Sequence, residues 1–224
     1  MTFESFIANS KAVFKRFPNE QVWLQGGFTP NSQLQKPEEG YCVVLRYDEK
    51  TTNLISDFMN KVCTVLPPLV EYNEQSFHTT IGVFAKGDLK GFVPDIALLR
   101  LLAKSVETGL RNSPGSPVVT FEKWLYNNEA LLISGYPNQD LWRLSQNIGA
   151  ACQENRVPLE RGRILHVTTA RFISGVPRPV FEQFLLLMES APVIGVTKPV
   201  AIDVATWQCD GLAFDMVTHE RFPL

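Results

Sequence analysis

Two short stretches, HTTIGVF at residues 78–84 and HVTTARF at residues 166–172, decide how this sequence is interpreted. They align without a gap, and both have the composition of a strand, in which successive side chains point to opposite faces. The face that begins with the histidine reads His, Thr, a small residue and Phe in both copies. The residues expected on this face are His78, Thr80, Gly82 and Phe84 in the first stretch and His166, Thr168, Ala170 and Phe172 in the second.

The polar residues of this face suit phosphoryl transfer. Imidazole has a near-neutral pKa, so one histidine can take a proton from the attacking oxygen while the other gives a proton to the leaving oxygen. A Thr hydroxyl two positions along the same face can donate a hydrogen bond to a non-bridging phosphate oxygen. We therefore predict that His78 and His166 are catalytic and that Thr80 and Thr168 bind the phosphate. The sequence leaves open which histidine is the acid and which is the base.

Three further residues are candidates for substrate binding. Phe84 and Phe172 are expected to wall the cleft, where the small residue before each of them leaves space beside the polar pair. Arg171 stands at an odd offset, so a regular strand turns it away from the cleft. A long side chain at the end of a strand can still reach a phosphate, and Arg171 is therefore kept as a candidate.

A chance occurrence is the alternative explanation of these motifs. One His followed by Thr two positions later is ordinary, but the chain has only three histidines and two of them carry the motif in matching strand contexts. The third, His219, lacks the motif and is expected at the surface.

No carboxylate or third histidine has ligand-like spacing from the pair, so we expect no metal and no cofactor.

The remaining pattern predicts alternating helices and strands. The strongest break in the sequence is the turn-rich segment 112–117, NSPGSP, which we interpret as a boundary between two lobes. On each side of it, a helix and a short connection lead into a histidine-bearing strand and a further helix, which is an internal repeat. We expect helices over 4–17, 51–66, 95–110, 140–154 and 178–189, and strands over 41–47, 77–84, 118–125, 130–136, 164–172, 200–208 and 212–217.

The repeat predicts an α+β fold in which two related lobes, each with an antiparallel or mixed sheet, face one another across a groove. Residues 1–40 are expected to form an N-terminal extension, and its part from residue 26 lacks clear periodicity. Residues 41–224 are expected to form a single two-lobed domain, with lobes near 41–112 and 117–224 and with exchange of strands between lobes allowed.

The two motifs also resemble the twin signature of the two-histidine phosphoesterase superfamily, which includes 2'-5' RNA ligase-like proteins and cyclic nucleotide phosphodiesterases. The resemblance spans residues 41–224 and is closer in the second copy. It implies a bilobal fold with pseudo-twofold symmetry, helices outside a central cleft, catalysis without a metal, and catalytic and phosphate-binding roles for His78, His166, Thr80 and Thr168. Thr169 stands where this superfamily often has Leu, and this departure puts the subfamily in question.

Composition limits the substrate and the location. The chain has 224 residues, 45% of them hydrophobic, and a formal net charge of −2, which argues against gripping long nucleic acid by general charge. Its four cysteines are far apart, and no apolar run has the length of a membrane helix. We expect a monomeric cytoplasmic protein with no membrane partner.

The leading hypothesis is a phosphodiesterase acting on a 2',3'-cyclic phosphate, or on a related nucleotide or RNA-end phosphodiester such as a 2'-5' linkage. The alternative is a non-catalytic protein that binds a nucleotide or an RNA end in the same cleft.

Overall fold

The structure, a computed structural model, describes residues 1–17, 38–66, 69–72, 76–85, 92–211 and 213–224. Most of the stretch predicted to be irregular, 26–40, and the first residue of the strand predicted at 212–217 lie outside these ranges. The helices are α1 (Phe3–Phe14), α3 (Glu49–Val65), α4 (Ile96–Arg111), α5 (Gln139–Glu154) and α6 (Arg178–Glu189). The strands are β1 (Glu38–Arg46), β2 (Leu69–Glu71), β3 (Thr79–Ala85), β4 (Val119–Tyr126), β5 (Ala130–Pro137), β6 (Glu160–Arg161), β7 (Leu165–Phe172), β8 (Gly195–Thr197), β9 (Ala201–Cys209) and β10 (Phe214–Pro223).

The strands form one continuous sheet, and the expectation of two separate sheets is wrong. The main path runs β10-β9-β1-β3-β7-β5-β4-β8, while β2 pairs with β7 and β6 pairs with β3. Every pairing between described strands is antiparallel. The two halves are continuous because β3 and β7, the two histidine-bearing strands, pair directly where Thr79 faces Val167. The predicted α+β class is confirmed.

The two halves of the chain have the same order of elements, except for the short strand β8 in the second half. The first half of the chain runs β1-α3-β2-β3-α4-β4, and the second runs β5-α5-β6-β7-α6 and then, after the short β8, β9. Each half lends strands to the other: β2 and β4 join the strands of the second half, whereas β6 and β9 join those of the first. The exchange makes both halves of the sheet depend on residues that are far apart in the sequence.

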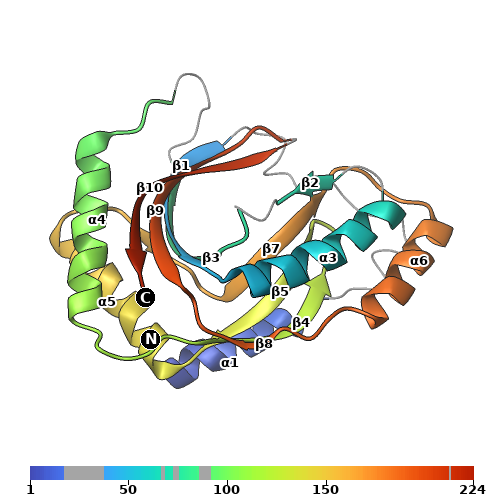
Figure 1. The fold of residues 1–224 in the computed structure, drawn as a ribbon, viewed down its shortest axis with the longest axis horizontal. Coiled ribbons are helices and arrows are strands. Elements are labelled where there is room, and N and C mark those ends of the chain that lie inside the picture. The colour runs from blue at the N-terminus through green and yellow to red at the C-terminus, as the bar shows by residue number, and fades with distance from the viewer. Residues whose placement is uncertain (18–37, 67–68, 73–75, 86–91, 212) are drawn as a thin grey trace.

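The five helices described were predicted to within three residues at each end, because each has an amphipathic run and most have a polar cap before it. Asp48, Asp95 and Asn138 accept hydrogen bonds from the first backbone amides of α3, α4 and α5. Figure 1 shows α4 and α5 together on one side of the sheet and α3 and α6 together on the other. Three strands of two or three residues, β2, β6 and β8, were not predicted because such short segments show no alternation.

Helix α1 packs against the sheet. Phe14 is buried with Leu125 and Leu132, and its ring meets the edge of Tyr136 at a centroid distance of 5.7 Å. Phe6 belongs to the main core. In the described part of the chain, no helix is long and apolar enough to cross a membrane.

Candidate active site

The contact between β3 and β7 brings the two motifs together. Thr79 and Val167, the middle residues of the two His-x-Thr motifs, face each other in an antiparallel pair. If this register is extended by one residue in each direction, His78 is opposite Thr168 and Thr80 is opposite His166. Because side chains alternate, these four lie on the face opposite to the buried Thr79 and Val167.

A β-bulge follows the threonine in both strands. In β3 the pairing with β1 skips Ile81, since Val43 pairs with Gly82 and Val44 with Thr80. In β7 the pairing with β5 skips Thr169, which is the equivalent position. A bulge inserts one extra residue and reverses which side chains face each side beyond it. The residues five positions after each histidine, Val83 and Arg171, therefore face the cleft.

The bulges overturn the placement expected for the phenylalanines. Phe172 is fully buried and packs against Phe184, and Phe84 stacks on the buried ring of Tyr41 at a centroid distance of 6.0 Å. Neither lines the cleft. The predicted face of His, Thr, small residue and Phe was wrong because it assumed a regular strand, without a bulge.

The two small residues also have a different role from the one expected. Ala170 is buried in the core. A Cβ on Gly82 would lie 2.7 Å from the Leu159 side chain and 3.1 Å from the Glu160 carbonyl oxygen, so glycine at this position lets β6 approach β3.

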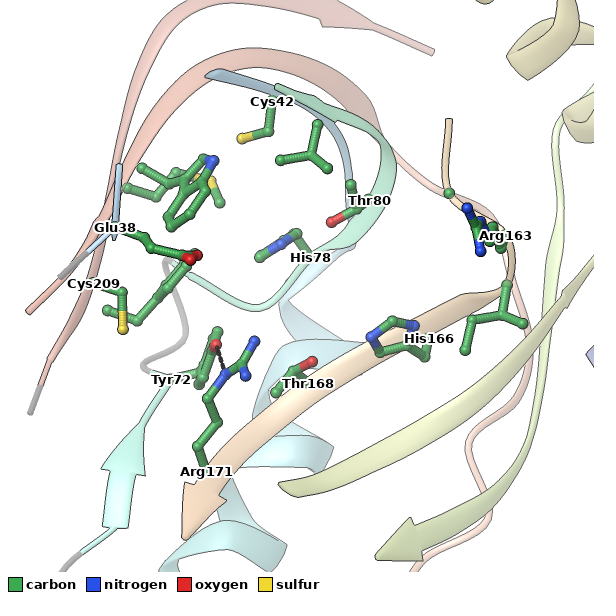
Figure 2. Close-up of a pocket in the computed structure, with 16 residues that line it drawn as sticks. Glu38, Cys42, Tyr72, His78, Thr80, Arg163, His166, Thr168, Arg171 and Cys209 are labelled. Carbon is green, nitrogen blue, oxygen red and sulfur yellow. Dashed lines mark hydrogen bonds between the residues drawn. The ribbon is translucent and has the colours of Figure 1, made fainter. Parts of the chain in front are cut away.

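The cleft contains a cavity of about 390 Å³. Figure 2 shows His78, Thr80, His166, Thr168 and Arg171 arranged around this common space. Arg163 lies on the side of His166, and the opposite wall is formed by side chains from β1, β9 and β10. The further residues of the lining include Glu38, Cys42, Tyr72, Trp207, Cys209, Phe214 and Met216.

His78 is oriented by the backbone beside it. Its Nδ1 is hydrogen-bonded to the carbonyl oxygen of Ser76, which acts as the acceptor, so Nδ1 carries the proton and Nε2 is left for the cavity. The ring stacks on Phe214 at a centroid distance of 5.8 Å. Burial lowers the pKa of His78 to about 4; the bond to Ser76 opposes this shift, and the charge of Arg46 reinforces it.

His166 has a different environment from His78. Its Nδ1 is buried and has no hydrogen-bond partner among the described residues. Burial lowers the pKa of His166 to about 4, and the positive charge of Arg171 contributes to the shift. Both histidines are therefore neutral at pH 7, and a bound anion would favour their protonated forms.

Arg171 is held in place by Tyr72. The guanidinium Nε donates a hydrogen bond to the Tyr72 hydroxyl at 2.9 Å. Tyr72 directly follows β2, which pairs with β7 and sets Val70 opposite Arg171. In a regular strand Arg171 would point away from the cleft, as expected from the sequence, and the bulge at Thr169 explains why it faces inward.

An aromatic wall, formed by Tyr72, Trp207 and Phe214, was not predicted. The Phe214 ring stacks on Tyr72 at 4.6 Å and on Trp207 at 6.1 Å between centroids. Trp207 and Phe214 belong to the C-terminal hairpin β9–β10, and β9 reaches the cleft by pairing with β1. No local pattern links these rings to the histidines, since the pairing that joins them is a long-range one.

Other reactive groups near the cleft have limited roles. Burial raises the pKa of the Cys42 thiol to about 12, so this group is not a thiolate at neutral pH. Among the described residues, no three or more His, Cys, Asp and Glu side chains cluster closely enough to hold a metal ion.

Comparison with known proteins places the fold. It is an antiparallel α+β fold that resembles several solved structures. TT0787 of Thermus thermophilus matches with a TM-score of 0.56 and 13% identity, over 83% of this chain and 97% of that one. E. coli LigT complexed with 3'-AMP matches with a TM-score of 0.50 and 11% identity, over 84% and 98%. A structure described as a phosphoesterase matches with a TM-score of 0.51 and 9% identity, over 83% and 98%.

Because the sequence identities are this low, the likeness establishes the fold alone. E. coli LigT has also been crystallised with ATP and with NADP+. No protein-family model and no curated protein sequence matches this chain.

Proposed function

We propose that this protein is a metal-independent phosphodiesterase that opens a 2',3'-cyclic phosphate, or a related nucleotide or RNA-end phosphodiester, by acid–base catalysis with His78 and His166. The observation that carries the proposal is the pairing of β3 with β7, which gathers two His and two Thr side chains on one face at one cavity. The phosphoesterase-like fold supports the same function.

The reaction proceeds by attack of water on the phosphorus. One histidine, neutral at the start, takes a proton from the water as the new P–O bond forms. The other, protonated once the anionic substrate is bound, gives its proton to the ribose oxygen as the P–O bond to that oxygen breaks. The product is a single nucleoside monophosphate in which one ribose hydroxyl is free, and the two histidines have exchanged protonation states.

The other cleft residues stabilise the charge and position the nucleoside. The hydroxyls of Thr80 and Thr168 donate hydrogen bonds to the non-bridging oxygens, where negative charge builds up in the transition state. Arg171, fixed by Tyr72, supplies a positive charge to the same oxygens. Phe214 and Trp207 offer a stacking surface for a base. The nucleotides bound in the LigT crystals, 3'-AMP and ATP among them, support a nucleotide as the substrate class.

The direct test replaces each histidine separately. His78→Ala and His166→Ala are each expected to lower the turnover of nucleoside 2',3'-cyclic phosphates at least about 100-fold, because each removes one proton-transfer group. The assay is run with a chelator present, and product formation is followed by chromatography. His219→Ala is the matched control, since His219 is exposed and hydrogen-bonded to Thr206 outside the cavity.

Full activity in either cleft variant would reject the mechanism. A wild-type protein that binds cyclic, 2'-5' linked and ADP-ribose-derived phosphates tightly but turns none of them over would favour a non-catalytic binding protein.

A further inference from the structure

Glu38 places a carboxylate in the wall of the catalytic cavity. It is the first residue of β1 and pairs with Cys209 of β9, which in turn pairs with Phe214 of β10. Paired residues of an antiparallel sheet point to the same face, and all three line the cavity. The same face carries the other cavity-lining residues of these strands, which are Cys42, Trp207 and Met216. Among the described residues of these three strands, Glu38 is therefore the one charged side chain in an otherwise apolar wall.

The carboxylate of Glu38 has no partner in the part of the chain that the structure describes. No residue there forms an ion pair with it or donates a hydrogen bond to it. The residue is half-buried, and Figure 2 shows its side chain pointing from β1 into the cavity. A partly desolvated carboxylate without a hydrogen-bond donor is unfavourable, and the apolar wall around it supplies none. A ligand that presents donors to Glu38 would remove this cost.

The two sides of the cavity differ in charge, and this difference orients a nucleotide. Arg163 and Arg171 line the cavity with the motif residues, and Figure 2 shows Glu38 and Arg163 on opposite sides of it. Because a carboxylate repels a phosphate, the phosphate is expected at the arginines, and the other end of the nucleotide is left for Glu38. That other end is the base, whose face can lie against the rings of Trp207 and Phe214.

Guanine is the RNA base whose edge matches a carboxylate best. A carboxylate accepts hydrogen bonds through both oxygens and donates none. Guanine has two donors side by side on its Watson–Crick edge, N1–H and the 2-amino group, so both oxygens of Glu38 can be used at once. Adenine, cytosine and uracil each have an acceptor next to the donor on this edge, and that acceptor would repel the second oxygen.

We propose that Glu38 selects guanine, by accepting hydrogen bonds from N1–H and the 2-amino group of the base whose ribose carries the reacting phosphate. This inference rests on the proposed function and makes it more specific. The substrate is then a guanosine 2',3'-cyclic phosphate, or an RNA end whose last nucleotide is guanosine. The apolar wall covers the face of the base, and Glu38 determines which base is accepted.

The test compares nucleoside 2',3'-cyclic phosphates that differ only in the base. The wild-type kcat/KM is expected to be at least about tenfold higher for guanosine than for adenosine, cytidine or uridine. Inosine, which keeps N1–H but lacks the 2-amino group, should fall between guanosine and adenosine. Glu38→Gln replaces one acceptor oxygen by an amide donor and should reduce the ratio of the guanosine to the adenosine value to about one. Glu220→Gln, an exposed change on β10 outside the cavity, is the matched control and should keep the wild-type ratio.

Equal kcat/KM values for the four bases in the wild type, or a preference for a base other than guanine, would overturn the inference while leaving the proposed function intact. So would a Glu38→Gln variant that keeps the wild-type ratio. If the wild type turns over none of the substrates, the proposed function fails and binding decides the inference separately. In that case calorimetry should show that 3'-GMP binds the wild type at least about tenfold more tightly than 3'-AMP, and equal affinity or no binding would overturn it.

Discussion

The two catalytic candidates are alike in the sequence but not in their surroundings. His78 has a carbonyl acceptor for its Nδ1, whereas the Nδ1 of His166 is buried with no partner among the described residues. Burial dominates the pKa shift of both. Both imidazoles are therefore neutral at pH 7, and a bound anion would supply the charge that lets one of them hold a proton.

These pKa shifts predict an acid-sensitive fold. In the unfolded chain a histidine titrates near 6.5, and in the folded protein both titrate at about 4. Between these pH values the unfolded state binds more protons, so the free energy of unfolding should fall as the pH is lowered from 6.5 to 4, and the contribution should be fully present above 6.5. Urea denaturation across this range measures the slope. The double variant His78→Gln/His166→Gln should flatten it, and an unchanged slope in that variant would contradict the assignment.

At the level of the elements, the paired bulges determine which side chains enter the cleft. The insertions at Ile81 and Thr169 come one residue after the threonine of each His-x-Thr motif. They turn Arg171 toward the cleft, and they turn Phe84 and Phe172 away from the cleft, into the packed interior. Strand β2 completes the arrangement, because its pairing with β7 brings Tyr72 within hydrogen-bonding distance of Arg171.

Tyr72→Phe tests this arrangement. The variant keeps the stack on Phe214 but loses the bond that orients the guanidinium, so KM for a cyclic phosphate should rise about three- to tenfold with a smaller change in kcat. Steady-state kinetics at several substrate concentrations separate the two constants. Tyr136→Phe, on β5 and outside the cavity, is the control. An unchanged KM in Tyr72→Phe would show that Arg171 does not depend on this contact.

At the scale of the whole molecule, a buried ion pair joins the C-terminal hairpin to β1. Asp203 on β9 is fully buried, and one of its oxygens lies 2.8 Å from Nε of Arg46 on β1. Arg221 on β10 bonds the same carboxylate, and Nη1 of Arg46 reaches the Phe77 carbonyl next to His78 at 3.5 Å. This network ties the hairpin that carries the aromatic wall to the segment that carries the first histidine.

Removing one partner of this pair should destabilise the fold. Arg46→Met leaves the Asp203 carboxylate buried with fewer partners and should lower the free energy of unfolding by about 3 kcal/mol. Arg178→Met is the matched control, because its pair with Glu182 is exposed, and it should change stability by less than about 1 kcal/mol. Urea denaturation measures the free energy of unfolding of both variants. If both lose a similarly small amount, the buried network adds little to the stability of the fold.

Local periodicity was enough to predict the helices, most of the long strands and the placement of the two His-x-Thr motifs at strands. The last strand is an exception, because β10 covers Phe214–Pro223 where a strand over 212–217 was expected. Each of these features is encoded by neighbours in the chain: a cap and an amphipathic face for a helix, alternation for a strand. The role of the four motif residues remains a prediction until the variants are assayed.

Long-range pairing determined the rest. The halves form one sheet because β3 pairs with β7 at Thr79 and Val167. The side chains of Arg171, Phe84 and Phe172 are placed by the bulges, that is, by the residue that has no partner on the neighbouring strand. Trp207 and Phe214 reach the histidines because β9 pairs with β1, which lies far away in the sequence. Such contacts are decided by packing and hydrogen bonding between distant segments, so alternation within a single strand carries no signal of them.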